Sequence, residues 1–166
     1  MDTTKWTNCV EIPKNAFEGV TFTKMIIQSC EKCNELELYI DPEAFGKSSL
    51  FIQQLDLSIK STSNFNDLRD AFVAINSLAN LRVLHINAGF NITHSHLFRN
   101  VISPGHRQNK LKIVEISGGF IQTIQSYPFY ELTNLNMINL KGNKISKIER
   151  HSFAFRDFSQ QEVSFD

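Results

Sequence analysis

The chain has no excess of either charge. Its 17 basic and 17 acidic residues give a formal net charge of zero, so we expect no overall electrostatic attraction to nucleic acid or to an anionic membrane. It also lacks long hydrophobic runs. Stretches such as Met25 to Ile27 are far shorter than the roughly 20 apolar residues that a membrane-spanning helix needs. The sequence therefore predicts neither nucleic-acid binding nor membrane insertion within this segment.

A secretory signal peptide is also missing from the start of the chain. The first ten residues, MDTTKWTNCV, contain neither a basic stretch nor an apolar core, and a signal peptide needs both. Cysteine is scarce, with three residues in 166. So small a number leaves the redox compartment open.

The most informative stretch that the sequence does contain is LNMINLKGNKISKIERHSF, near the C-terminus. Leu135, Ile138 and Leu140 follow the pattern L-x-x-L-x-L, which is typical of a short strand with alternate side chains pointing inward. Asn143 and Ile145 extend it to L-x-x-L-x-L-x-x-N-x-L. Where the strand turns, an asparagine side chain can satisfy backbone groups of neighbouring coils. We therefore interpret this stretch as one coil of a repeat.

The same frame recurs along the chain. In LKIVEISGGFIQTIQSYPF a glycine, Gly119, replaces the turn asparagine. The first apolar positions of successive copies, which lie 30, 29, 30 and 24 residues apart, are Phe22, Ile52, Leu81, Leu111 and Leu135. A second element, I-x-x-x-x-F, follows in the back half of a coil, and we expect it to fill the rest of the coil's interior. Its copies are Ile12/Phe17, Ile40/Phe45, Ile124/Phe129 and Ile148/Phe153.

These motifs resemble leucine-rich repeats of the extracellular type, with longer irregular coils in the first part of the chain. More narrowly, the mixture resembles arthropod secreted leucine-rich repeat proteins. The resemblance implies an α/β solenoid, a right-handed leucine-rich repeat horseshoe. In this fold a parallel concave β-sheet is backed by irregular, 3-10 and short helical convex segments.

The repeat frame covers nearly the whole chain. We expect a single leucine-rich repeat domain over residues 1–166, with about five coils plus partial coils at the ends. Neither end shows the polar or disulfide-bonded cap that an array of stacked coils needs. We therefore interpret the chain as a fragment of a longer array, with a small complete domain as the alternative.

The resemblance implies an extracellular or secreted location rather than a cytoplasmic one. Cys9, Cys30 and Cys33 are the disulfide candidates. Stacked coils lie about 5 Å apart, so a bond from Cys9 to either of the other two is reasonable. Three buried reduced thiols are the open alternative. Asn91 begins the N-I-T sequon, which predicts a glycosylation site if the chain is secreted.

We expect no metal site and no cofactor. The insert after the sequon carries His94, His96 and His106, but no carboxylate or cysteine lies at ligand spacing from them. The segment SPGHRQNK is typical of a solvated loop. A thioredoxin-like role for Cys30 and Cys33 would need a helix start after a strand, which this chain does not offer.

The outward positions of the concave strands predict a protein-binding surface. Val83, Ile113 and Met137 occupy one column, three coils in succession, and form an exposed apolar ladder. Charged and polar residues in the adjacent columns surround this ladder. They are Asp56, Arg82, His85, Lys112, Glu115 and Asn139. An apolar anchor with a polar rim is the composition of an interaction hot spot, although strand residues chosen only for β-propensity would look similar.

Asp56, His85 and Glu115 in consecutive coils also raise the question of catalysis. Chemistry would need a nucleophile or metal, a pocket and a base in a dry environment, and an open concave sheet does not offer these. We interpret the three as a cross-strand ladder of charges with weak mutual support. The sequence therefore predicts a non-enzymatic binding or scaffolding module with a protein partner. The alternatives are an intracellular leucine-rich repeat adaptor and a non-catalytic subunit of a secreted enzyme.

Overall fold

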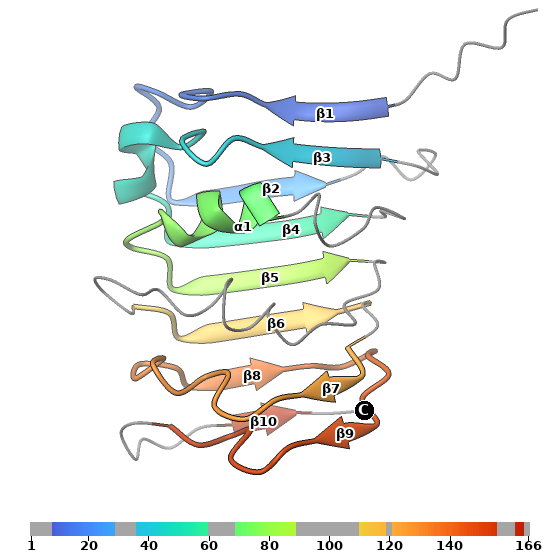
Figure 1. The fold of residues 1–166 in the computed structure, drawn as a ribbon. Helices are drawn as coiled ribbons and strands as arrows, with labels where there is room; N and C mark the ends of the chain where they lie inside the picture. Colours follow the sequence, from blue (N-terminus) through green and yellow to red (C-terminus); the bar gives the residue numbers. More distant parts are fainter. Residues whose placement is uncertain are drawn as a thin grey trace, which may run out of the picture.

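The computed structural model describes residues 8–28, 36–59, 69–88, 110–118, 121–155 and 162–164. In this part of the chain, parallel strands stack side by side, and the segments between them return along the opposite side (Figure 1). The chain is therefore an α/β solenoid. Its elements are, in order, β1 Asn8–Ile12, β2 Lys24–Gln28, β3 Leu36–Ile40, the 3-10 helix η1 Gly46–Leu50, β4 Gln54–Ile59, α1 Arg69–Asn76, β5 Val83–Ala88, β6 Ile113–Ser117, β7 Thr123–Ile124, β8 Met137–Asn139, β9 Lys147–Ile148 and β10 Glu162–Ser164.

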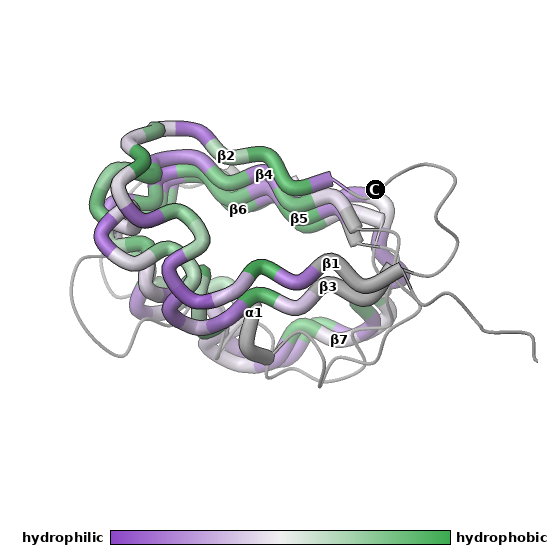
Figure 2. Tube along the Cα trace, turned by 90° about the horizontal axis from the view of Figure 1, so that it is seen from above, coloured by the Kyte–Doolittle hydropathy of each residue, from purple (hydrophilic) through white to green (hydrophobic). Residues whose placement is uncertain are grey.

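The largest sheet contains the strands that carry the L-x-x-L-x-L pattern. Its order is β10-β8-β6-β5-β4-β2, and every neighbouring pair is parallel. We call it the concave sheet. Seen from above, it forms one layer of the molecule, while β1, β3, α1 and β7 form the other (Figure 2). This two-layer coil is what the repeat frame predicts.

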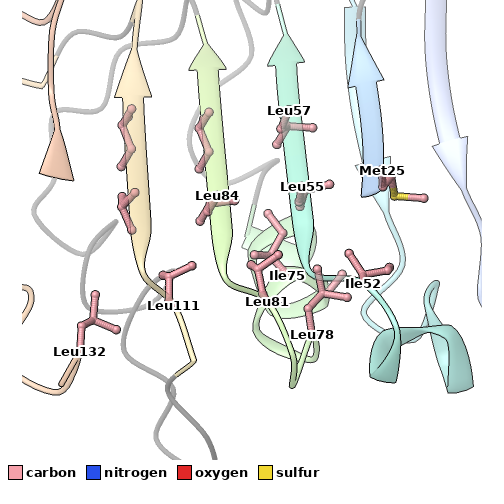
Figure 3. Close-up of a cluster of buried hydrophobic side chains, with 14 of the residues drawn as sticks. Met25, Ile52, Leu55, Leu57, Ile75, Leu78, Leu81, Leu84, Leu111 and Leu132 are labelled. Carbon is pink, nitrogen blue, oxygen red and sulfur yellow. The ribbon is translucent and has the colours of Figure 1, made fainter. Parts of the chain in front are cut away.

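The core lies between the two layers. Alternate side chains of the concave strands point inward and meet apolar residues from the returning segments (Figure 3). For example, Leu55 and Leu57 of β4 pack in the same cluster as Ile75 of α1 and Leu78 just after it. The six side chains that the frame places most firmly inside are all buried. They are Leu84, Ile86, Leu111, Ile116, Ile138 and Leu140.

The turn asparagine has the structural role that the repeat frame assigns to it. The amide nitrogen of Asn143 donates to the carbonyl of Leu140 in its own coil and to that of Ile116 in the preceding coil, each at 2.7 Å. The side-chain oxygen of Asn143 is buried and accepts no hydrogen bond within the described part of the chain. The side chain therefore joins two coils only through the hydrogen bonds that its amide nitrogen donates.

The back halves of the coils form two short sheets besides the 3-10 and helical segments. β1 pairs with β3, and β7 pairs with β9, both in parallel. Each of these strands ends at the isoleucine of an I-x-x-x-x-F motif, and the phenylalanine rings of the motifs stack between coils. The ring centroids of Phe17 and Phe45 are 5.8 Å apart, and those of Phe129 and Phe153 are 5.9 Å apart.

One core prediction is wrong. Ile148 was expected to fill its coil but is 52% exposed, whereas Ile124 at the same position of the preceding coil is fully buried. Ile124 is followed by a coil with a back half of its own, β9. Within the described residues, Ile148 is followed only by β10. A repeat position is buried by the coil that follows it, and here that cover is incomplete.

Candidate protein-binding surface

The predicted apolar ladder is present on the outer face of the concave sheet. Val83 of β5 lies opposite Ile113 of β6, which lies opposite Met137 of β8. The intervening positions of these strands are buried, so the three side chains face away from the core, and each is half-buried. The column itself is confirmed, and its use as a contact site remains a prediction.

A polar column runs beside the ladder, two residues further along each strand. The strand register places Asp56 of β4, His85 of β5, Glu115 of β6 and Asn139 of β8 side by side. On β2 the same column begins with Ile26, which is 60% exposed. The surface therefore changes from apolar at its β2 edge to charged over its centre.

Asp56 is the most fully bonded member of this column. Its carboxylate lies 2.9 Å from Nζ of Lys24 and 2.9 Å from Nδ1 of His85, and it accepts hydrogen bonds from the amide of Gln54 at 3.0 and 3.2 Å. Partial burial alone would raise the pKa of Asp56. The hydrogen bonds from Gln54 and Lys24, with the charges of His85 and Lys24, outweigh burial and hold the pKa of Asp56 below its ordinary value.

Glu115 makes longer contacts. Its carboxylate is 3.5 Å from Nε2 of His85 and 3.5 Å from the amide nitrogen of Asn139. Charge-assisted hydrogen bonds are usually about 2.7–2.9 Å long. Lys24 and the column thus form a continuous network of polar contacts that ends at Asn139. The contacts are short at Asp56 and long at Glu115.

Two basic residues flank the ladder on its other side. Arg82 and Lys112 lie just before β5 and β6, and both are exposed. Their backbones fix the start of the strands, because the carbonyl of Arg82 accepts the N–H groups of Lys112 and Ile113 at 2.8 and 3.1 Å. On β6 the surface therefore passes from basic Lys112, through apolar Ile113, to acidic Glu115.

A shallow hollow of about 160 Å³ opens at the acidic side. Asp56, His85 and Glu115 line it, and the next outward position of the same three strands adds Ser58, Asn87 and Ser117. Repeat spacing places these six polar residues in two parallel rows of three. The repeat frame that predicts the first row from the sequence also places Ser58 and Ser117 in the neighbouring column.

The arrangement around His85 does not activate a nucleophile. Its two ring nitrogens face the carboxylates of Asp56 and Glu115 rather than a hydroxyl group. A serine nucleophile would need one of those nitrogens as its base. The interpretation of these three residues as a charge ladder agrees with this geometry, with tighter contacts at Asp56 than weak surface pairs usually show.

Several predicted residues lie outside the described part of the chain. Cys30, Cys33 and the glycosylation candidate Asn91 are among them. So are the three histidines of the insert, and of Cys9 only the backbone, in β1, is described. The disulfide and glycan expectations therefore remain predictions. Over the described ranges, no cluster of three potential metal ligands occurs.

Comparison with known proteins identifies the repeat. Residues 109–155 match the leucine rich repeat family. This region contains β6 to β9 and the turn asparagine, and the strand register extends the same frame to β2. Residues 109–155 therefore carry leucine-rich repeats, and the described part of the chain folds as a leucine-rich repeat solenoid. No curated protein matches the chain.

Leucine-rich repeat domains generally serve in protein binding or scaffolding and are typically not catalytic. This chain has an open sheet with an apolar strip, which is the general kind of surface that such domains use. Within the described residues, no helix is long and apolar enough to cross a membrane.

Proposed function

We propose that this protein is a non-enzymatic binding or scaffolding module that docks a protein partner on its concave sheet. The observation that supports the proposal is the apolar ladder of Val83, Ile113 and Met137, in register over three neighbouring strands. Neighbouring strands lie about 4.8 Å apart, so the three side chains form one continuous strip.

The surroundings of the ladder also favour a contact role. Arg82 and Lys112 border it on one side, and Asp56, His85 and Glu115 on the other. Adjacent apolar side chains that remain partly open to solvent mark an interaction site more often than scattered single ones do. Charges of both signs at the rim would orient the partner and raise its rate of association.

Replacing an anchor of the ladder tests the proposal. A partner is isolated from the native source with the wild-type chain, and its affinity is measured by titration with Ile113→Asp. We expect binding to weaken by more than about 1 kcal/mol. Because Ile113 is half-buried, urea unfolding of the same variant shows whether the sheet itself remains folded.

The matched control is Glu149→Ala, on the opposite side of the coil beside β9. This variant should bind the partner as the wild type does. Loss of binding confined to Glu149→Ala would show that the partner uses the convex side, and the proposed surface would then be wrong.

We also propose that the protein works outside the cell, on the strength of its resemblance to extracellular-type repeats. The sequon at Asn91 and the three cysteines are consistent with such a location. Mass spectrometry of the protein from its native source tests this. A mass that changes on reduction and on glycosidase treatment is expected, and a mass that changes with neither treatment would contradict it.

A further inference from the structure

We infer that the hollow beside Glu115 receives a basic side chain, an arginine or a lysine, of the protein partner. The inference rests on the proposed binding function and adds the chemistry of one partner residue. It is carried by an imbalance between the two carboxylates that line the hollow.

Asp56 has little capacity left for a new partner. Lys24 and His85 each contact its carboxylate at 2.9 Å, and Gln54 adds an amide at 3.0 Å. A lysine and two polar neighbours therefore already neutralise and orient this charge. A cation from outside would have to displace one of them.

Glu115 has the capacity that Asp56 lacks. Its contacts with His85 and Asn139 are both 3.5 Å long, and its side chain is 36% exposed. A carboxylate offers about four acceptor sites on its two oxygens. A guanidinium or ammonium group can approach from the solvent side and make shorter hydrogen bonds than either of these contacts.

The hollow has the right size and lining for the head of one side chain. Its volume of about 160 Å³ is well below the roughly 300 Å³ at which ligand pockets usually begin. Ser58 and Ser117 line the same space, and their hydroxyl oxygens are acceptors suited to the N–H groups of a cation. The planar fork of arginine could contact Glu115 and one serine together.

The hollow is also positioned for use together with the apolar ladder. Ile113 and Glu115 lie two residues apart on β6, on the same face of the sheet, which separates them by about 7 Å. Alternate residues of an extended partner segment, i and i+2, span a similar distance and point to the same face. A partner with an apolar residue two positions before a basic one would therefore fill both places.

A defined pair of peptides tests the inference without the native partner. The probes are acetyl-leucyl-glycyl-arginine amide and its neutral twin, acetyl-leucyl-glycyl-citrulline amide. Each is titrated into the full chain at low salt while the backbone amide signals of His85 and Ser117 are followed by NMR. We expect the arginine peptide to bind at least about fivefold more tightly. Glu115→Gln, which keeps the shape of the side chain and removes its charge, should abolish that preference.

Glu11→Gln is the charge-matched control, because Glu11 is exposed on β1, outside the concave sheet. This variant should keep the full preference for arginine. Equal binding of the two peptides, a preference that survives Glu115→Gln, or failure of both peptides to bind would each overturn the inference. If the two peptides bind equally and both bind more weakly to Ile113→Ala, the concave surface would still be supported as the binding site. The inference of a basic partner side chain would then be wrong.

Discussion

The first and last parts of the solenoid carry the same back-half motif, yet their isoleucines are buried differently. Ile12 on β1 and Ile40 on β3 are both buried. In the last part, Ile124 on β7 is buried, but Ile148 on β9 is half exposed. Backbone pairing does not explain the difference, because β1–β3 and β7–β9 are parallel pairs of the same kind.

The difference shows that burial in a solenoid belongs to a pair of coils rather than to one motif. A coil contacts only its neighbours, so each apolar layer is covered by the next coil. Ile12, Ile40 and Ile124 are each followed by a described coil with a back half. Ile148 has no such cover within the described residues. The same side chain should therefore contribute very different stabilisation at equivalent positions.

Truncating the two isoleucines of the last part should separate them most clearly. Ile124→Ala removes buried methyl groups and leaves a cavity, so it should lower the free energy of unfolding by about 2–5 kcal/mol. Ile148→Ala should lower it by less than about 1 kcal/mol. Urea unfolding followed by circular dichroism measures both. Ile40→Ala, in the first part, should behave like Ile124→Ala, and equal midpoints for Ile124→Ala and Ile148→Ala would contradict the coil-pair explanation.

The columns of the concave sheet were predictable from the sequence. Strand side chains alternate with a period of two, and the repeat spacing fixes which residue of one coil lies beside which residue of the next. The alignment of Val83, Ile113 and Met137 followed from these two facts alone. Inward positions such as Leu84 and Ile138 followed in the same way.

The contact distances of individual residues within a column were not predictable from the sequence. Asp56 and Glu115 have equivalent sequence positions, yet one has contacts of 2.9 Å and the other of 3.5 Å. These distances depend on side-chain rotamers and on Lys24, which reaches Asp56 diagonally from the neighbouring strand β2. The exposure of Ile148 was missed for a related reason, because a motif does not describe what covers it.

The backbone at the turn after the back strands β1, β7 and β9 offers a second comparison. Asn15, Tyr127 and His151 all have positive φ angles, of 57°, 59° and 65°, and each lies three residues after the isoleucine of its motif. Asparagine and histidine tolerate this left-handed conformation, whereas the bulky ring of Tyr127 adopts it at a cost. Tyr127 and His151 stack on each other with ring centroids 5.2 Å apart, which offsets part of that cost.

Asn15→Tyr should therefore destabilise the first part of the chain by about 1 kcal/mol. The equivalent residue of the next coil is Glu43, so the new ring would have no aromatic partner there. Thermal unfolding compares this variant with Asn15→Gly, which keeps the left-handed conformation and should change stability by only a few tenths of a kcal/mol. A tyrosine variant as stable as wild type would show that the turn relaxes without strain.

The charged pairs at the two ends should respond to opposite ends of the pH scale, and this is the smallest effect we expect. Glu149 accepts a hydrogen bond from Lys147 at 3.1 Å and another from the backbone N–H of Ser126 in the preceding coil at 3.2 Å, and these hold its pKa below the ordinary value. Its contribution to stability is therefore present above about pH 4.5 and is lost as the pH falls through the lowered pKa.

Lys14, in the first part, has its pKa raised above 10.5, chiefly by its hydrogen bond to Glu43. Its contribution is present below that pH and is lost as the pH rises through the raised pKa. The difference in melting temperature between wild type and Glu149→Gln should thus vanish in acid, whereas that for Lys14→Gln should vanish in strong alkali. Both differences should be small and should shrink with added salt, because the groups are exposed to solvent. Melting curves at low salt across the pH range measure this, and two differences that fade in the same window would show that the pairs do not act through the charges identified here.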